Sequence, residues 1–186
     1  MKKTILFSIL AAAVMITACQ NKHDDTCAPL DISIGDIAQI VPTADNVVCR
    51  DTAFYDIVDQ NGEIAGAVLL SEPYSAEIQG YNGPTPLRII ITEDRRIALV
   101  EMLDNEETPR FAERVKRSGL LEKWEGLTVD EALNAEVDAV SGATYTSKAV
   151  IESMKTRLTA YQKQVQKETP HEQGFGSRLK KFFGIH

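Results

Sequence analysis

The most regular pattern in this sequence is a helical one that starts near residue 151, and it constrains the fold more than any other feature. Apolar residues recur there at alternating intervals of three and four, which places them on one face of a helix: Ile151, Met154, Leu158, Tyr161 and Val165. Residues 138–147, a stretch rich in small and hydroxyl side chains, lead directly into this pattern. The rest of the chain is therefore expected to be organised around a long helix that follows a glycine-containing turn.

The turn before this helix has two explanations. The backbone N–H groups in the first turn of a helix have no intrahelical partners and carry a partial positive charge, so a phosphate group binds favourably there. Gly142 would let the backbone approach such a group closely. Serine, threonine and aspartate are also the usual N-cap residues, so an ordinary capping turn accounts for the same pattern. The residues alone leave both explanations open.

Three short motifs together resemble one known family. Residues 141–144 (Ser-Gly-Ala-Thr), preceded by Asp138, resemble the flavinylation motif of the FMN-binding domain family. Upstream, residues 80–84 (Gly-Tyr-Asn-Gly-Pro) resemble the family's glycine-tyrosine-x-glycine-proline turn, and residues 107–109 resemble its Glu-Thr-Pro loop. The family includes the FMN-carrying subunits of the sodium-translocating NADH:quinone oxidoreductase and of the Rnf electron-transport complex. The resemblance covers roughly residues 48–158.

The resemblance implies a cofactor and the residues that hold it. In the relatives, a dedicated flavin transferase bonds the phosphate of FMN to the last threonine of the motif, which is Thr144 here. Three neighbours would hold the phosphate end: Ser141, Gly142 and Ala143. The upstream motifs would flank the ring through Tyr81, Glu107 and Thr108. Tyr145 either stacks on the flavin or is an ordinary exposed or core residue. Asp138 is either recognised by the transferase or caps the helix locally, and none of these residues is expected to be catalytic.

The beginning of the chain predicts export. Lys2 and Lys3 precede an apolar run over residues 5–16, which is too short to cross a bilayer as a helix. The run ends in Ile-Thr-Ala-Cys, which resembles a bacterial lipobox, so residues 1–18 are expected to be a lipoprotein signal peptide and Cys19 the lipidated residue. A plain signal peptide with a coincidental cysteine is the alternative. The expected protein is an exported bacterial lipoprotein, anchored to the membrane by lipid and facing the periplasm or the cell exterior.

Charge and length limit the partners and the number of domains. Without Lys2 and Lys3, 18 basic residues remain against 27 acidic ones, and this excess argues against nucleic acid as a partner. The part after the leader is the size of one domain. We expect a tether and N-terminal segment over residues 19–47, an FMN-binding domain over 48–166 and a basic-apolar tail over 167–186. The tail either docks on a membrane or an acidic partner, or is simply solvated.

Hairpin and capping signals predict an α+β fold. Residues 54–59 and 63–70 flank an Asn-Gly turn and are expected to form a hairpin. Residues 87–92 and 97–103 flank residues 93–96 in the same way. Together the two hairpins predict an antiparallel sheet of about four strands with one face covered. Helices are expected from Thr108-Pro109 to Gly119, and from Thr128, with Glu131 in a capping box, through Leu133. The residues between these helices are expected to be core: Leu120, Leu121 and Trp124.

The side chains capable of ordinary catalysis are few. All three histidines fall in the expected tether or tail: His23, His171 and His186. Within the domain this excludes a Ser-His or Cys-His pair and a histidine-rich metal site, and no metal is expected. Cys27 and Cys49 either pair, which an exported compartment permits and which would stabilise the fold by roughly 3 kcal/mol, or remain two free thiols.

These observations predict that any redox chemistry comes from a cofactor. The expected function is extracytoplasmic electron transfer through FMN bonded to Thr144, with a flavin transferase needed for maturation and membrane-bound or extracytoplasmic redox partners. Two alternatives from other classes stay open. One is a flavin-dependent reductase of a small extracytoplasmic acceptor, and the other is a structural lipoprotein that has the fold without redox activity.

Overall fold

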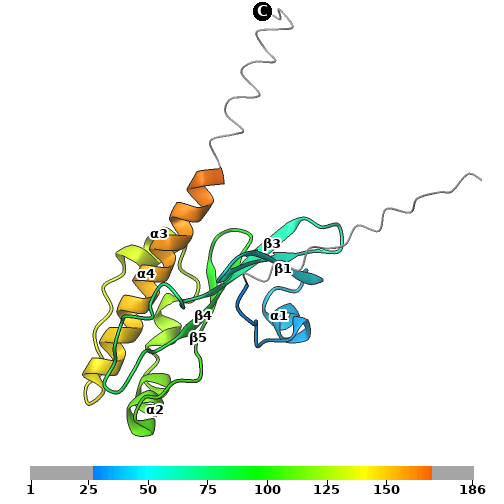
Figure 1. The fold of residues 1–186 in the computed structure, drawn as a ribbon. Coiled ribbons are helices and arrows are strands. Elements are labelled where there is room, and N and C mark those ends of the chain that lie inside the picture. The colour runs from blue at the N-terminus through cyan, green and yellow to red at the C-terminus, as the bar shows by residue number, and fades with distance from the viewer. Residues whose placement is uncertain (1–26, 169–186) are drawn as a thin grey trace, which may run out of the picture.

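The computed structural model describes residues 27–168. The leader, Cys19, the three histidines and most of the expected tail lie outside these residues. Five strands form one antiparallel sheet in chain order: β1 (Asn46–Asp51), β2 (Phe54–Val58), β3 (Ile64–Leu70), β4 (Leu87–Thr92) and β5 (Ile97–Met102). The helical elements are α1 (Ile34–Ile40), α2 (Pro109–Arg117), the 3-10 helix η1 (Leu121–Trp124), α3 (Val129–Asn134) and α4 (Thr144–Glu168) (Figure 1). The α+β class is confirmed.

The sheet contains the four predicted strands and one more. The Asn-Gly turn between β2 and β3 forms as expected, with Gly62 at a φ of 82° and the Asp59 carboxylate accepting the N–H groups of Asn61 and Glu63 at 2.8 and 2.9 Å. The additional strand is β1, which pairs with β2 at the edge of the sheet. Its side chains are exposed or half-buried throughout, so it lacks the apolar alternation that reveals a strand in a sequence.

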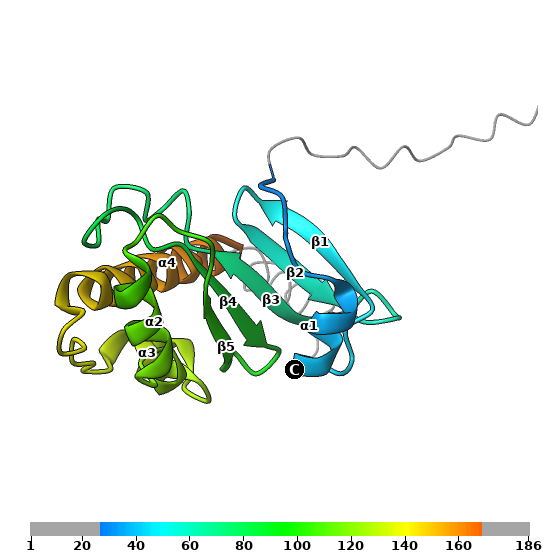
Figure 2. The same ribbon diagram turned by 90° about the horizontal axis from the view of Figure 1, so that it is seen from below.

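The expectation that only one face of the sheet is covered is wrong. Ile89 and Ile91 of β4 face a core formed with the helices that follow the sheet, while Ile90 faces a second core that includes Ile37 of α1. Figure 2 shows α2, α3 and α4 gathered on one side of the sheet. Successive side chains of a strand point to opposite faces, and both faces are buried here, which explains the three consecutive isoleucines of β4. Each of these three isoleucines is fully buried and contributes about 1.5–3 kcal/mol.

The helices that follow the sheet, and that form the first of these two cores with it, begin and end largely where the sequence predicts. Pro109 occupies the first turn of α2, and Gly119 follows that helix at a φ of 71°. The capping box of α3 is complete, because the Glu131 N–H donates to Thr128 Oγ1 at 3.2 Å and the Thr128 N–H donates to Glu131 Oε2 at 2.8 Å. The predicted core residues Leu120, Leu121 and Trp124 are all buried.

Helix α4 is the longest element, at 25 residues, and it begins at Thr144. Its predicted apolar face packs into the core between the sheet and the helices that follow it. Met154, Leu158 and Tyr161 are buried there, and Ile151 and Val165 are partly buried. The helix therefore runs along the sheet and carries residue 144 to one end of the molecule. Within residues 27–168, no helix is both long enough and apolar enough to cross a bilayer.

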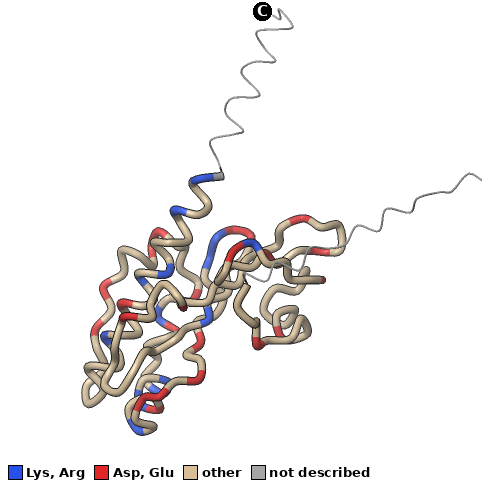
Figure 3. Tube along the Cα trace, viewed as in Figure 1, with Lys and Arg blue, Asp and Glu red and all other residues tan. Residues whose placement is uncertain are grey.

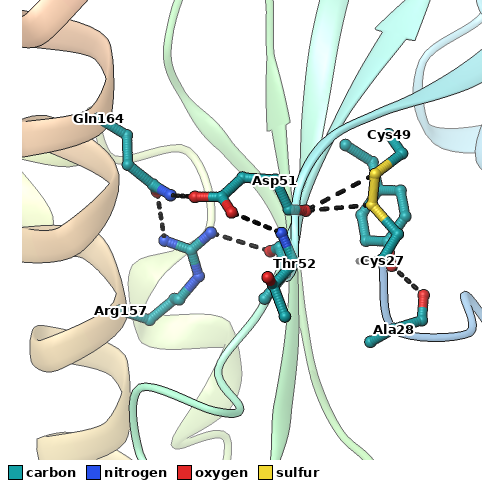
Figure 4. Close-up of a disulfide and its surroundings, with 9 residues drawn as sticks. Cys27, Ala28, Cys49, Asp51, Thr52, Arg157 and Gln164 are labelled. Carbon is teal, nitrogen blue, oxygen red and sulfur yellow. Dashed lines mark hydrogen bonds between the residues drawn. A yellow bond between two sulfur atoms is a disulfide. The ribbon is translucent and has the colours of Figure 1, made fainter. Parts of the chain in front are cut away.

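A disulfide joins Cys27 to Cys49, with 6.3 Å between their Cα atoms. It ties the segment before α1 to the edge strand β1, as Figure 4 shows. The same segment is held by the Ala28 N–H, which donates to Thr52 O at 3.0 Å, and by the Tyr55 hydroxyl, which donates to Ala28 O. Of the two states open from the sequence, the structure has the paired one.

Candidate functional site

Three segments that are far apart in the sequence meet at the start of α4. A pocket of about 250 Å³ is lined by the turn after β3, by α2 and by the residues that begin α4: Tyr81, Phe111, Gly142, Ala143, Thr144, Tyr145 and Thr146. In Figure 1 the long connection between β3 and β4 extends toward the yellow start of α4, with α2 below it. The structure thus brings the predicted flavinylation motif and the predicted glycine-tyrosine turn to one place.

The glycine-tyrosine turn is held by the Glu-Thr-Pro loop. The buried carboxylate of Glu107 accepts the N–H groups of Tyr81 and Asn82 through Oε1, at 2.5 and 3.4 Å. The Asn82 amide donates to Glu106 O at 2.6 Å, which adds a second link between the two segments. A Cβ atom on Gly80 would lie 1.8 Å from Glu107 Oε1, so a larger residue at this position would displace the Glu107 carboxylate from its place under the turn. Glu107 therefore lies behind the turn and fixes its shape, which presents Tyr81 at the surface.

Replacing Glu107 should destabilise the turn. Glu107→Ala leaves two N–H groups without their acceptor, and we expect a loss of about 1–3 kcal/mol in the free energy of unfolding, measured by urea denaturation. Glu106→Ala is the matched control, because its side chain is exposed and the carbonyl that accepts from Asn82 remains. Equal unfolding midpoints for the two variants would contradict this role of Glu107.

Aromatic side chains border the pocket. The Tyr81 ring packs edge-to-face on Phe111, with 4.9 Å between the ring centroids, and the guanidinium of Arg110 lies 4.6 Å from the same Phe111 centroid. Tyr81 and Tyr145 remain 60% and 70% exposed. A core position for Tyr145 is thereby excluded, while stacking on a ligand stays open. Large aromatic surfaces that stay exposed beside a pocket suit a planar, partly apolar ligand.

The turn before α4 is fixed by one hydroxyl group. The buried Ser147 Oγ accepts the N–H of Val140 at 2.9 Å and donates to Ala143 O at 2.8 Å. Gly142 takes a φ of 77°, a conformation that other residues adopt only with strain. Ala143 is buried under this turn, whereas Thr144 is exposed at the first position of the helix. The Thr144 hydroxyl is therefore open to a modifying enzyme.

Thr146 supplies the clearest sign of a missing ligand atom. Its side chain is fully buried and lines the pocket, and its Oγ1 has no hydrogen-bond partner within residues 27–168. Burying an unpaired hydroxyl costs about 1–3 kcal/mol, so such groups in folded proteins are normally satisfied. An acceptor at the start of α4, such as a phosphate oxygen, would satisfy it. The residues present therefore fit a ligand that places a hydrogen-bond acceptor here, as a phosphate oxygen would.

Not every predicted site residue lines the pocket. Thr108 precedes α2 and makes no capping hydrogen bond through its side chain. Ser141 is exposed and contributes its carbonyl, which accepts from Arg114 Nη1 at 3.5 Å. Asp138 is exposed in a shallow groove beside α4 and, in the described part of the chain, makes no side-chain hydrogen bond to the helix start. A local capping role for Asp138 therefore has no support in this structure.

Sequence reasoning missed two residues of α2 at this site, Phe111 and Arg114. Both belong to a helix for which the sequence predicted only the bounds, from Thr108-Pro109 to Gly119. Phe111 follows the Glu-Thr-Pro motif closely, which is a usable signal for a contact with the same ligand. Arg114 gives no such signal, because its position against residues 141 and 142 depends on how α2 and α4 pack.

Comparison with known proteins points in the same direction as the geometry. Residues 80–159 match the FMN-binding domain family model, which confirms the resemblance that the three motifs indicate. The match begins at Gly80 and leaves out β1–β3, which the resemblance from the sequence had included. No curated protein matches the chain.

One solved structure that the chain matches is the crystal structure of NqrC from Shewanella oneidensis. The sequence identity is 19%, the alignment covers 62% of this chain and 66% of that chain, and the TM-score is 0.37. The chain therefore spans slightly less than two thirds of the length of that protein.

Proposed function

We propose that this chain, which carries an FMN-binding domain over residues 80–159, holds FMN through a phosphoester bond to Thr144 and carries electrons outside the cytoplasm. The observation that supports this most is the position of Thr144. Its hydroxyl is exposed at the first residue of α4, beside a pocket that contains the buried, unpaired hydroxyl of Thr146. Attachment forms one bond between Thr144 Oγ and phosphorus and breaks the bond between phosphorus and the leaving oxygen of the activated FMN ester that the transferase uses as donor. The leaving group departs with the hydroxyl proton of Thr144, so the chain gains FMN less one water.

A covalent bond suits the shape of the site. Micromolar binding of free FMN needs about 8 kcal/mol, whereas the electrostatics of a helix start contribute about 1 kcal/mol. The pocket of about 250 Å³ is open to solvent and offers few polar contacts. Attachment removes dissociation, so the ring can remain at the surface, where a redox partner can approach it. FMN supplies the redox chemistry when bound, and the protein supplies attachment and orientation.

The residues around Thr144 have distinct roles in this proposal. Glu107 fixes the turn that presents Tyr81, and Ser147 fixes the turn that presents Thr144. The exposed rings of Tyr81 and Tyr145 offer faces against which a flavin can stack. This open aromatic border favours an electron carrier over a reductase, because a reductase of a small acceptor normally encloses its substrate in a concave pocket.

Denaturation tests the proposed linkage. Protein produced together with a flavin transferase should keep its yellow colour and flavin fluorescence after acid precipitation and washing, and protein produced without the transferase should lose both. A washed precipitate without flavin would contradict the linkage. Steady-state turnover with small artificial acceptors then distinguishes the alternatives, since saturation by the acceptor is expected of a reductase and a linear dependence of a carrier.

We further propose that Cys19 anchors the protein to the membrane by lipid, on the basis of the leader described above. Cys19→Ser should abolish incorporation of labelled fatty acid and release the protein from the membrane fraction, because the variant lacks the thiol that carries the proposed lipid anchor. Asn21→Ala is the control, since it changes a residue two positions after Cys19 and leaves the cysteine itself in place. Equal membrane association of Cys19→Ser and wild type would rule out the anchor.

A further inference from the structure

The guanidinium group of Arg114 lies against the turn that begins α4. Its Nη1, Cζ and Nε atoms are 3.3, 3.4 and 3.5 Å from the position that a Cβ atom on Gly142 would occupy. Nη1 also donates to the carbonyl oxygen of Ser141 at 3.5 Å. This hydrogen bond is long and therefore weak, and it involves only one of the five N–H groups of the guanidinium. The guanidinium of an arginine from α2 therefore lies against Gly142, two residues before Thr144 in the sequence.

Arg114 differs from the other arginines on its helix. Arg110, Arg114 and Arg117 recur at intervals that place them on one face of α2. Figure 3 shows that this helix carries both basic and acidic positions. Arg117 pairs with Glu113 at 3.1 Å, and Arg110 lies over the Phe111 ring. Among residues 27–168, no carboxylate lies within ion-pair distance of Arg114. Its donors are available to an anion.

The unmodified chain holds this cation at an electrostatically unfavourable place. The start of a helix carries roughly half a positive charge, and acidic residues in the first turn usually offset it. Helix α4 has no acidic residue in its first turn, and Arg114 adds a full positive charge beside it. The buried Thr146 hydroxyl, which lines the pocket at the start of α4, is a further unsatisfied group near this turn. Three independent features of the site, the helix start, the unpaired arginine and the orphaned hydroxyl, thus fit one negative charge.

We propose that Arg114 is the counter-cation of a phosphoryl group at the start of α4, and that Arg114, Thr146 and the first turn of α4 form an anion-binding site. The proposal rests on the proposed function only in taking the phosphate of FMN as the natural occupant. A phosphodiester carries one negative charge, which the single charge of Arg114 balances. The planar fork of arginine can donate two parallel hydrogen bonds to phosphate oxygens, which lysine cannot reproduce.

The test uses the unmodified mature chain, produced without a flavin transferase and labelled with ¹⁵N. Inorganic phosphate is titrated at constant ionic strength, and the backbone amide signals of residues 142–146 are followed by NMR. In the wild type these signals should shift saturably. Arg114→Gln should raise the apparent dissociation constant about tenfold, because a charged donor pair is lost. Arg114→Lys should fall between the two.

Arg117→Gln is the matched control, because it removes an arginine from the same face of α2 that does not contact the turn. It should titrate like the wild type, and all variants should give otherwise superimposable spectra. The site is refuted if the wild type shows no saturable shift, or if Arg114→Gln titrates like the wild type. An equal loss in Arg117→Gln would also refute it, since the effect would then come from overall charge.

A second pair of probes identifies the part of the flavin that is recognised. Free FMN should shift the same amide signals as inorganic phosphate, and riboflavin, which lacks the phosphate, should not. Equal shifts with riboflavin would overturn the assignment, since the ring would then be the recognised part. The titrations need no covalent attachment, so their outcome is separate from that of the proposed bond to Thr144.

Discussion

Thr144→Ala should abolish covalent flavin completely and leave the fold intact. The variant removes only the hydroxyl that we propose to be bonded to phosphorus. Thr144 is exposed and makes no side-chain hydrogen bond in the described part of the chain, so we expect the free energy of unfolding to change by about 1 kcal/mol or less. Flavin fluorescence of the denatured protein and its intact mass measure the attachment, and urea denaturation measures the stability.

Thr146→Ala is the matched control for this variant. Thr146 is a threonine in the same turn of α4, but its side chain is fully buried whereas Thr144 is exposed, so Thr144 is the expected acceptor. It should keep the label, although its attachment can be slower because it contributes to the proposed anion site. Flavin that persists in Thr144→Ala and disappears in Thr146→Ala would show that the bonded residue is Thr146 and would contradict the assignment to Thr144.

Arg157→Met should cause the largest loss of stability of any single substitution discussed for this protein. The fully buried guanidinium donates from Nε to Leu70 O at 2.7 Å and from Nη2 to Ala53 O at 2.9 Å. It also lies 4.7 Å from the centroid of the Tyr74 ring. Figure 4 shows how Gln164 links Arg157 to Asp51, near the disulfide. One side chain thus joins α4 to β3 and to the turn after β1.

Burial lowers the pKa of Arg157 to about 10, and the nearby Tyr74 and Asp51 partly oppose this shift. The group therefore stays protonated at neutral pH, and both of its bonds to carbonyl oxygens are charge-assisted. Methionine fills a similar volume but donates no hydrogen bond, so we expect a loss of about 3 kcal/mol in the free energy of unfolding. Lys163→Met, an exposed change on the same helix, should have little effect. Equal urea midpoints for the two variants would contradict the role of Arg157.

Local patterns predicted the parts of the fold that local interactions determine. The Asn-Gly turn, the capping box at Thr128 and the apolar face of α4 each depend on residues close in sequence, and each forms as predicted. Helix α1 gave little signal, because it is short and buries only Ile37. Strand β1 gave little signal because an edge strand without buried side chains does not need an apolar alternation.

Arg157 could not be predicted because its partners are backbone carbonyl groups from distant parts of the chain, and backbone partners leave no mark in a sequence. Its bonds to Leu70 and Ala53 span 87 and 104 residues. The pattern of α4 shows its apolar face and gives no indication that an arginine is buried beside it.

In the candidate site, too, local motifs were predictable from the sequence and the contacts between distant segments were not. The motifs around Gly80, Glu107 and Thr144 were found separately, and the sequence assigned the first two to ring contacts. The structure adds that Glu107 supports the Tyr81 turn from behind, and that α2 brings Phe111 to the pocket and Arg114 to the turn at Gly142. These relations depend on packing between elements. A motif can identify the residues of a site, but the contacts among the motifs arise only when the chain folds.

Fragmentation of one peptide tests the central claim most directly. Trypsin releases residues 124–148 as a single peptide, which contains Thr144 together with the other hydroxyl residues of the turn. In protein produced with a flavin transferase, tandem mass spectrometry should find the mass of FMN less one water on this peptide, with the fragment ions assigning it to Thr144. An unmodified peptide, or a modification assigned to Ser141, Thr146 or Ser147, would contradict the account.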